Sequence, residues 1–365
     1  MSSCIKPTDK GIYMKFSALK QTIIEQFMAP KGNMVVPFIE GRPGGGKSAC
    51  AREIADHLCE VFNIKPEQVV EFNPSLRDPV DIMGIPFKSV DGKHSEWLPP
   101  AEFYNLRQGV GPCVLIIEEL SDAQLTMQNP MCRVILDRYA GNLQLSDQLF
   151  IIATGNRVED RSGANRMSTK LGNRMRCLEF SEDLGDWVNW AESHNIDNIL
   201  ISFIKFQPNL LSDFDPKRKT NPTPRAWEKV SYIPEFSGDP DGILYMSHVM
   251  GDVGEGAAAS YIGFRKVYKS LPDFDELLKS PKTYKIPSEQ SALFATCQKL
   301  ATMVTKDTSD ADVIAILTYI ARTSMEMKAA TIRDMVRVPE KKKKLCSRGC
   351  LKTFMDISKD LQLVL

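Results

Sequence analysis

A glycine-rich loop early in the chain has the residue types and spacing needed to bind phosphate groups. It fits the pattern G-x-x-x-x-G-K-[ST], in which glycines let backbone N–H groups curl around phosphate oxygens at the N-terminus of a helix. Lys47 would reach the β- and γ-phosphates of a nucleotide, and Ser48 would ligate Mg²⁺. A glycine turn that closes a strand is the alternative, but it does not use every position of the pattern. The loop consists of Gly41, Arg42, Pro43, Gly44, Gly45, Gly46, Lys47 and Ser48.

Two acidic residues follow an apolar run at residues 114–117. A strand that ends in Glu118 and Glu119 near a phosphate loop suggests one carboxylate for the metal and one for water. Glu118 would hold Mg²⁺ through the water shell of the ion, and Glu119 would orient or deprotonate the attacking water. The alternative is a solvated acidic strand end with no chemical role.

Asn156 follows a second apolar run, residues 149–153. In parallel sheets, ligands bind at the carboxyl ends of the strands, so this amide is expected at the same site. It would hold the lytic water or the γ-phosphate. An ordinary Asn-Arg turn is the alternative, because asparagine is a common turn residue.

The apolar pattern predicts strands that alternate with helices. Helices are expected at 15–28, at 47–62 with Ile54, Leu58 and Val61 facing inward, and at 131–139. Strands are expected at 35–39, 69–72, 114–117, 149–153 and 177–180, while residues 1–14 and 73–112 look irregular. Continuous apolar strands indicate a parallel sheet covered on both faces. The sequence therefore predicts an α/β domain.

After about residue 183 the strand signals stop. Apolar residues between 187 and 206 indicate helices, and further helices are expected near 223–233, 254–270, 288–306, 309–328 and 347–362. The α/β domain is therefore followed by a mostly helical half.

Composition and charge exclude several classes of protein. The 365 residues carry 46 Lys plus Arg and 46 Asp plus Glu, so the formal charge is zero, unlike that of a histone-like protein. No apolar stretch is long enough for a membrane span, and the first residues show no secretory signal. The nine cysteines form no C-x-x-C pair, which favours reduced thiols and a cytoplasmic setting.

Five motifs in this order resemble the AAA+ ATPases of the MoxR and dynein-related branch. The resemblance covers roughly residues 30–235 and is much more specific than any one motif. It implies a P-loop NTPase core with a helical lid, and an ATP-hydrolysing ring, usually hexameric, that uses ATP and Mg²⁺ at subunit boundaries. The motifs lie at residues 41–48, 116–119, 153–157, 171–174 and 222–227.

The resemblance also implies roles for individual residues. Residues 41–48 correspond to the Walker A loop, Glu118 and Glu119 to the Walker B pair, and Asn156 to sensor 1. Arg174 corresponds to the arginine finger that acts in a neighbouring subunit, with Arg176 as a close rival. Arg225 corresponds to sensor 2. A planar, permanently charged guanidinium suits charge that develops on a γ-phosphate, although either arginine could instead form a surface salt bridge.

The sequence departs from the family pattern at Glu118, where the family usually has Asp. A longer side chain can still reach Mg²⁺ through water, but it could weaken metal binding. This departure puts the rate of hydrolysis in doubt and leaves nucleotide binding unaffected.

The domains expected are an N-terminal helical extension (1–30), the AAA+ core (31–183), a lid with sensor 2 (184–240) and a partner-specific helical region (241–365).

Other features have weaker interpretations. Trp97 would be either an exposed contact in the ring pore or, slightly favoured, a buried anchor for a long loop. Residues 341–344 are all lysines and are expected to form a solvated linker before the last helix, with nucleic-acid or acidic-partner contact as the alternative. The four histidines, and the pair Cys346 and Cys350, are not expected to bind metal.

Together these features predict a MoxR-like ring ATPase that remodels another protein or complex. By resemblance alone, a protein with a von Willebrand factor A domain is the first candidate partner. One rival keeps the ATPase but acts on nucleic acid, as a motor or a loader does. A second rival is a scaffold that binds ATP with little hydrolysis, for which Glu118 is the only support.

Overall fold

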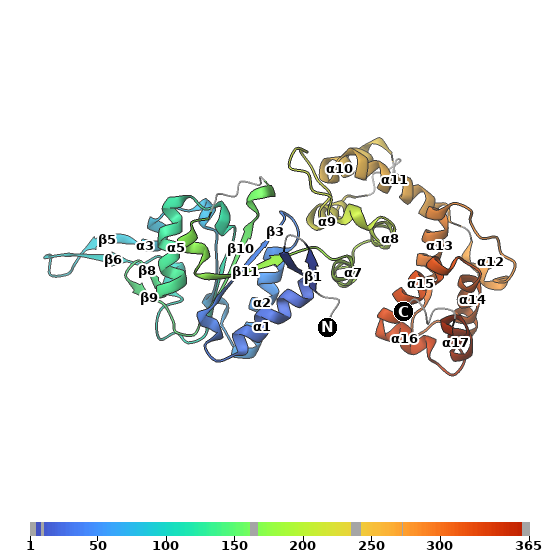
Figure 1. The fold of residues 1–365 in the computed structure, drawn as a ribbon, viewed down its shortest axis with the longest axis horizontal. Coiled ribbons are helices and arrows are strands. Elements are labelled where there is room, and N and C mark those ends of the chain that lie inside the picture. Colours follow the sequence, from blue (N-terminus) through green and yellow to red (C-terminus); the bar gives the residue numbers. More distant parts are fainter. Residues whose placement is uncertain (1–4, 9–10, 161–166, 235–241, 272, 360–365) are drawn as a thin grey trace. The chain divides into compact units, whose positions relative to one another are not determined.

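The computed structural model describes residues 5–8, 11–160, 167–234, 242–271 and 273–359. The chain divides into two compact units (Figure 1). The α/β unit comprises Met1–Asn195 and Asn209–Tyr232, and the helical unit comprises Ile196–Pro208 and Ile233–Leu365. The domain boundaries expected from the sequence stay a prediction.

A seven-stranded sheet forms the centre of the α/β unit, in the order β1-β2-β11-β3-β10-β7-β4. Only the β1–β2 pair is antiparallel, and the other neighbours are parallel. The predicted P-loop strand β3 therefore lies between β11 and β10, and β10 separates it from β7. The strands are β1 (Ile5–Thr8), β2 (Gly11–Met14), β3 (Val36–Gly41), β4 (Val69–Phe72), β7 (Cys113–Ile117), β10 (Leu149–Asn156) and β11 (Met175–Phe180).

Helices cover both faces of this sheet. Alternate residues of β7 and β10 point to opposite faces, as strand geometry requires. Leu115 and Ile151 pack toward α5 (Leu125–Asp137), whereas Ile116 and Ile152 pack toward α1 (Phe16–Met28) and α2 (Lys47–Phe62). The prediction of a parallel sheet buried on both faces is confirmed.

Helix α2 and strand β4 have the predicted bounds, and α1 begins one residue later than predicted. The inner face of α2 is confirmed for Ile54 and Leu58, which are fully buried. It is wrong for Val61, which is 51% exposed. At this end of the helix the inward position belongs to Phe62, whose ring centroid lies 5.0 Å from that of Phe150.

Several predicted elements are longer in the structure, and β10 continues from the predicted 149–153 to Asn156. Helix α5 begins at Leu125 and contains Pro130, a residue type that obscures helical periodicity, whereas the helix was expected only from residue 131. Strand β11 begins at Met175. The N-terminal residues, expected to be irregular, form β1 and β2, and β2 joins the sheet beside β11.

Residues 73–112 are not all loop. They include α3 (Val80–Met83), α4 (Ala101–Tyr104) and a hairpin of β5 (Ile85–Lys88) and β6 (Ser95–Leu98) that extends from the unit (Figure 1). All eight strand residues of the hairpin are exposed, so no alternation of buried and exposed positions marked them in the sequence. Trp97 is 41% exposed, and the prediction of a buried anchor is wrong.

The remaining elements of the α/β unit are short. Strands β8 and β9 form a second two-stranded ladder, and three helices follow β10 and β11 in the chain. These elements are β8 (Tyr139–Ala140), β9 (Leu143–Gln144), α6 (Thr169–Gly172), α7 (Leu184–Ser193) and α9 (Pro224–Ser231).

The helical unit contains no strand among its described residues. The single helix expected at 309–328 is two helices, because Ser324 caps a new one by accepting a hydrogen bond from Met327 N. None of the described helices has the length and apolar character needed to cross a bilayer. The helices are α8 (Asn198–Phe206), α10 (Ile243–Val253), α11 (Glu255–Lys269), α12 (Phe274–Lys279), α13 (Gln290–Met303), α14 (Asp310–Ala321), α15 (Met325–Arg337), α16 (Pro339–Leu345) and α17 (Leu351–Lys359).

The four consecutive lysines do not form a linker. They belong to α16, where Lys344 Nζ lies 2.7 Å from Asp310 Oδ1 and Lys341 Nζ donates to Ala301 O at 2.8 Å. Two of the four ammonium groups therefore hold the helix against its own unit. The prediction of a solvated linker is wrong because lysine stems and heads can pack along a helix surface.

Candidate nucleotide-binding site

The phosphate loop joins the end of β3 to the start of α2. Gly44 and Gly46 have φ angles of 73° and 108°, a left-handed region that favours glycine. A Cβ on Gly44 would also lie 2.8 Å from Thr223 Oγ1. Gly46 is the N-cap of α2, so the loop leads directly into the positive end of that helix. Both glycines are required by the backbone, as the sequence pattern predicted.

Lys47 is the most deeply buried cation of the loop, with 9% of its surface exposed. Its Nζ donates to three oxygens: Gly41 O at 2.9 Å, Arg42 O at 2.7 Å and Asn156 Oδ1 at 2.9 Å. Burial lowers the pKa of Lys47 from its ordinary value of 10.5 to about 8, against a smaller opposing effect of Glu182. None of the three hydrogen-bond acceptors is a carboxylate. A bound phosphate would therefore supply the negative charge that the ammonium group lacks.

Asn156 links the phosphate loop to the end of the neighbouring strand. It lies opposite Gly41 in the parallel pairing of β10 with β3. Its Oδ1 accepts from Lys47, its Nδ2 donates to Asp122 Oδ2 at 3.1 Å, and its backbone N donates to Ser121 Oγ at 2.8 Å. The structure thus brings Asn156 and Lys47 together, as expected, and adds Asp122 and Ser121, which the sequence analysis missed.

Glu118 and Glu119 leave the end of β7 with different surroundings. Glu118, with 19% of its side chain exposed, accepts from Arg52 Nη2 at 2.9 Å. Glu119 has a left-handed φ of 52°, and its Oε2 accepts from Asn73 Nδ2 at 2.9 Å and Ser75 Oγ at 3.2 Å. Asn73 directly follows β4, so the rule that found Asn156 could also have found Asn73.

Arg174 lies at the amino ends of the parallel strands, whereas the phosphate loop lies at their carboxyl ends. It directly precedes β11, whose first residue, Met175, pairs with Val36 at the start of β3. About 17 Å of strand separates that level from Gly41, at about 3.3 Å per residue. Arg174 Nη1 donates to Lys170 O at 2.6 Å, and its Nε is buried without a hydrogen-bond partner in the described chain. The structure does not bring Arg174 to the phosphate loop of its own chain.

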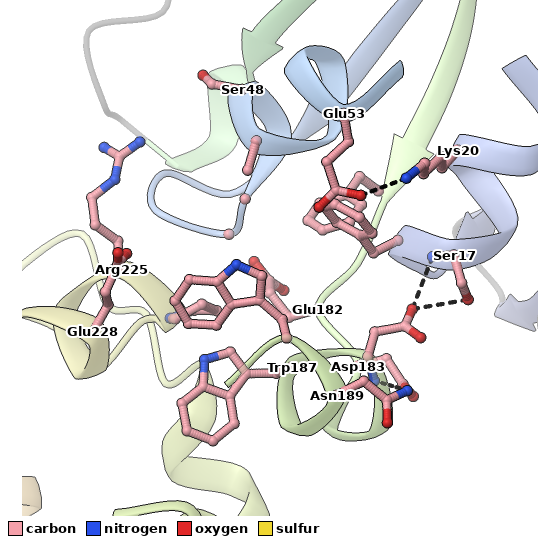
Figure 2. Close-up of a pocket in the computed structure, with 18 of the residues that line it drawn as sticks. Ser17, Lys20, Ser48, Glu53, Glu182, Asp183, Trp187, Asn189, Arg225 and Glu228 are labelled. Atoms are coloured by element: carbon pink, nitrogen blue, oxygen red, sulfur yellow. Dashed lines mark hydrogen bonds and ion pairs between the residues drawn. The ribbon is translucent and has the colours of Figure 1, made fainter. Parts of the chain in front are cut away.

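The two other arginines have separate positions. Arg176 Nη1 donates to Gln26 Oε1 at 2.7 Å, so this guanidinium is engaged on the surface of α1. Arg225 lies in the first turn of α9, and its backbone N donates to Gly44 O at 3.2 Å. Its exposed side chain lines the cavity beside the phosphate loop (Figure 2). Arg225 is therefore beside the loop, as expected, and Arg174 is not.

A cavity of about 620 Å³ adjoins the phosphate loop, a size typical of small-ligand sites. Figure 2 shows Ser48 and Arg225 at this cavity, with Lys20 and Ser17 on the far side from Arg225. Trp187 and Glu182 also line it, and Trp187 Nε1 and Glu182 Oε1 are buried without partners in the described chain. Trp187 and Glu182 therefore contribute to the wall of the cavity, while these two polar atoms lie beneath its surface.

The residues present fit a magnesium ion that arrives with a nucleotide. The described residues contain no group of three or more His, Cys, Asp or Glu side chains able to hold a metal ion. Two candidate ligands are present instead. One is the Ser48 hydroxyl at the N-terminus of α2, and the other is the Glu118 carboxylate, which forms an ion pair with Arg52 of the same helix. Mg²⁺ keeps several waters and binds through one or two carboxylates plus substrate phosphates, which matches this small set of ligands.

No family model matches the sequence, and the curated proteins include no match. Among solved structures, the chain is similar to a DNA polymerase III gamma-subunit-related protein from Thermotoga maritima, at 12% identity over 94% of this chain and 96% of that chain, with a TM-score of 0.30.

Two further solved structures are similar. NtrX from Brucella abortus matches at 18% identity over 73% of this chain and 59% of that chain, with a TM-score of 0.39. A RuvB mutant from Thermotoga maritima matches at 13% identity over 73% and 74%, with a TM-score of 0.37. Identities and TM-scores of this size do not indicate a function. The parallel sheet, the phosphate loop and the helix that follows it define an α/β P-loop NTPase fold.

Proposed function

We propose that this chain is an AAA+ ATPase of the MoxR and dynein-related type, which forms a ring, with six subunits as the expected number. ATP binding and hydrolysis would drive the remodelling of a protein partner or complex. One observation carries this proposal: Asn156, which is hydrogen-bonded to Lys47, and Glu119 lie at the carboxyl ends of adjacent strands, whereas Arg174 lies at the opposite end of its strand. A single chain therefore supplies most of a hydrolytic site and lacks the arginine that would complete it.

Nucleotide binding would use the phosphate loop and Lys47. The loop N–H groups and the ammonium group would contact the β- and γ-phosphates, while Ser48 and Glu118 would hold Mg²⁺, which neutralises phosphate charge when bound. Asn156 already donates to Asp122 and accepts from Lys47, so its amide is oriented before a ligand arrives. Preoriented dipoles are effective because they need no rearrangement during the reaction.

Hydrolysis would use Glu119 as the base for the attacking water. In the nucleotide-free chain its Oε2 accepts hydrogen bonds from Asn73 and Ser75. Glu119 is exposed, and these bonds use only one of its two carboxylate oxygens, so Oε1 can accept from a water molecule. Asn73 and Ser75 are therefore positioning residues that fix the orientation of the base.

Arg174 would act on the nucleotide of a neighbouring subunit, and Arg225 would act on that of its own chain. Among the described residues the Arg174 guanidinium has one hydrogen bond, from Nη1 to Lys170 O, which leaves Nη2 for a group of another molecule. Arg225 is connected to the loop through the hydrogen bond from its backbone N to Gly44 O. Movement of α9 would therefore be transmitted to the phosphate loop.

Two other functions are less well supported. A nucleic-acid motor would need free basic residues, and of the four lysines at 341–344 two, Lys341 and Lys344, are used inside the helical unit, whereas Lys342 and Lys343 are exposed. A scaffold that binds ATP with little hydrolysis is favoured by Glu118 and by its ion pair with Arg52. A partner with a von Willebrand factor A domain stays a proposal that rests on the resemblance.

The test is ATP turnover per subunit in mixtures of two inactive variants. Glu119→Gln removes the base, and Arg174→Ala removes the guanidinium, so each variant alone should lose at least about a hundredfold in turnover. In a mixed ring with equal amounts, one half times one half, or about a quarter, of the interfaces would combine an intact Glu119 with an intact Arg174. We therefore expect the mixture to recover about a quarter of the wild-type rate.

The controls separate assembly from chemistry. Arg176→Ala, two residues after Arg174, should keep full turnover, and the rate per subunit of the wild type should rise with protein concentration. Recovery in the mixture would support a site shared between subunits. A mixture as inactive as its components, combined with a wild-type rate that does not depend on concentration, would contradict the ring mechanism.

A further inference from the structure

Arg52 connects two carboxylates at the edge of the sheet where the metal would bind. It lies on α2 four residues after Ser48, which is about one helical turn. Its Nε and Nη2 donate to Glu71 Oε1 and Oε2 at 2.8 and 2.9 Å, a bidentate contact. The same Nη2 also donates to Glu118 Oε1 at 2.9 Å. One guanidinium therefore links the helix to the ends of β4 and β7.

This arrangement puts a permanent cation directly on the predicted metal ligand. Glu71 Oε2 and Glu118 Oε1 both lie 2.9 Å from the same nitrogen, so the two carboxylates face each other across a single atom. The three side chains together carry one net negative charge. Without Arg52 the two carboxylates would face each other with two negative charges, a combination that attracts a divalent cation.

We propose that Arg52 occupies the cation position on Glu118 in the nucleotide-free chain, so that the site accepts Mg²⁺ only together with a nucleotide. The inference rests on the proposed function, since it concerns the order in which metal and ATP enter that site. A free magnesium ion would have to give up water and approach the positively charged guanidinium, and it would gain only one carboxylate ligand. The β- and γ-phosphates supply the missing negative charge, so the ion and the nucleotide enter together.

The contact with Arg52 depends on the length of the Glu118 side chain. Arg52 is held against β4 by its bidentate bond to Glu71, and the Glu118 side chain spans the distance from the end of β7 to that guanidinium. Its other oxygen, Oε2, accepts no hydrogen bond from the described residues. Arg52 is therefore a positioning residue: it fixes one oxygen of Glu118 and keeps a positive charge beside the second.

The test is binding of Mn²⁺ alone, as a substitute for Mg²⁺, to the nucleotide-free full-length protein, followed by the electron paramagnetic resonance signal of free Mn²⁺. We expect Arg52→Gln to bind Mn²⁺ about tenfold more tightly than the wild type, an estimate that allows for the half-exposed position of Arg52. Arg52→Lys keeps the charge and should stay near the wild type. The double variant Arg52→Gln with Glu118→Gln should lose the gain, since the ion would then lack its ligand.

Two further variants keep the result independent of folding defects. Glu71→Gln leaves Arg52 paired with Glu118 alone and should weaken Mn²⁺ binding, the opposite direction to Arg52→Gln. Arg218→Gln breaks an exposed ion pair with Asp213 in the same unit and should change nothing. Mn²⁺ affinity that is unchanged or lower in Arg52→Gln would overturn the inference. Failure of the proposed function would look different, because the wild type would then bind no ATP even with saturating Mg²⁺.

Discussion

In the α/β unit several buried side-chain atoms lack a hydrogen-bond partner in the described chain, whereas the helical unit pairs nearly all of its own. Among the described residues, six such atoms belong to the α/β unit, and one, Tyr268 OH, belongs to the helical unit. The six are Asp160 Oδ2, Arg174 Nε, Glu179 Oε2, Glu182 Oε1, Trp187 Nε1 and Ser212 Oγ.

The helical unit satisfies its polar groups internally. Asp334 Oδ2 accepts from Gln298 Nε2 at 2.9 Å and lies 3.3 Å from Lys205 Nζ. The hydroxyls of Thr296 and Thr331, both fully buried, donate to carbonyls one turn earlier in their helices. Unpaired buried polar groups are costly, and a ligand or water that reaches them lowers that cost. We therefore expect ligand binding to depend on polar groups of the α/β unit, and stability to depend on those of the helical unit.

The largest effect is expected when Lys47 of the α/β unit is replaced. Because its ammonium group is buried without a carboxylate partner, Lys47→Ala should change the free energy of unfolding by less than about 1 kcal/mol. Loss of a charge-assisted contact to phosphate should weaken ATP binding by at least about a hundredfold. Titration with a fluorescent ATP analogue measures the affinity, and denaturant unfolding measures the stability.

Lys20→Ala, in the same cavity, is the control, and its affinity for ATP should fall by less than about tenfold. A variant that unfolds easily but still binds ATP would refute the comparison.

The reverse experiment removes a polar group from the helical unit. Asp334→Ala deprives Gln298, which is 4% exposed, of its hydrogen-bond acceptor and should lower the free energy of unfolding by about 2 kcal/mol. The affinity for ATP should stay as it is. Denaturant titration tests the first expectation, with Asp356→Ala, which breaks an exposed pair, as a control that changes it by less than about 0.5 kcal/mol. A stable Asp334→Ala variant with impaired ATP binding would mean that this network serves the nucleotide site.

The smallest effect expected is a dependence of ATP affinity on pH. The pKa of Lys47 is about 8 in the nucleotide-free chain, and bound phosphate, which favours the charged form, must raise it. Above pH 8, binding therefore requires proton uptake, and the affinity should fall by about tenfold between pH 8 and 9.5.

The stability of the nucleotide-free chain should change in the opposite direction over the same range. The folded pKa lies below the unfolded value of 10.5, so the folded state gains stability as the pH rises from about 8 toward 10.5. Calorimetry at pH 7.5, 8.5 and 9.5 measures both trends. Lys47→Arg, whose charge is permanent, should abolish the change in affinity, and an equal slope in that variant would assign the effect to another group.

The sequence predicted best those site residues whose positions depend on the ends of parallel strands. Lys47 and Asn156 are 109 residues apart, yet the rule that ligands bind at the carboxyl ends of parallel strands brought them together. The covered faces of β7 and β10 followed from their continuous apolar runs. These features depend on residue type and local order, which a single sequence contains.

Contacts between exposed or irregular segments could not be predicted in this way. Arg52 is 19 residues from Glu71 and 66 from Glu118, and pairs of long charged side chains leave no periodic pattern. The hairpin of β5 and β6 is exposed on every strand residue, so it lacks alternation, and β1 and β2 are only four residues each. These elements are defined by pairing with partners that only the folded chain brings close.

The left-handed backbone of Glu119 has a consequence for how such a chain evolves. A non-glycine residue at a φ of 52° stores backbone strain, on the order of 1 kcal/mol or more, that glycine would relieve. A single change of base in a glutamate codon gives glycine. Mutation and selection for stability alone would therefore drive this position away from glutamate. We therefore expect glutamate to persist at this position only where its carboxylate is used.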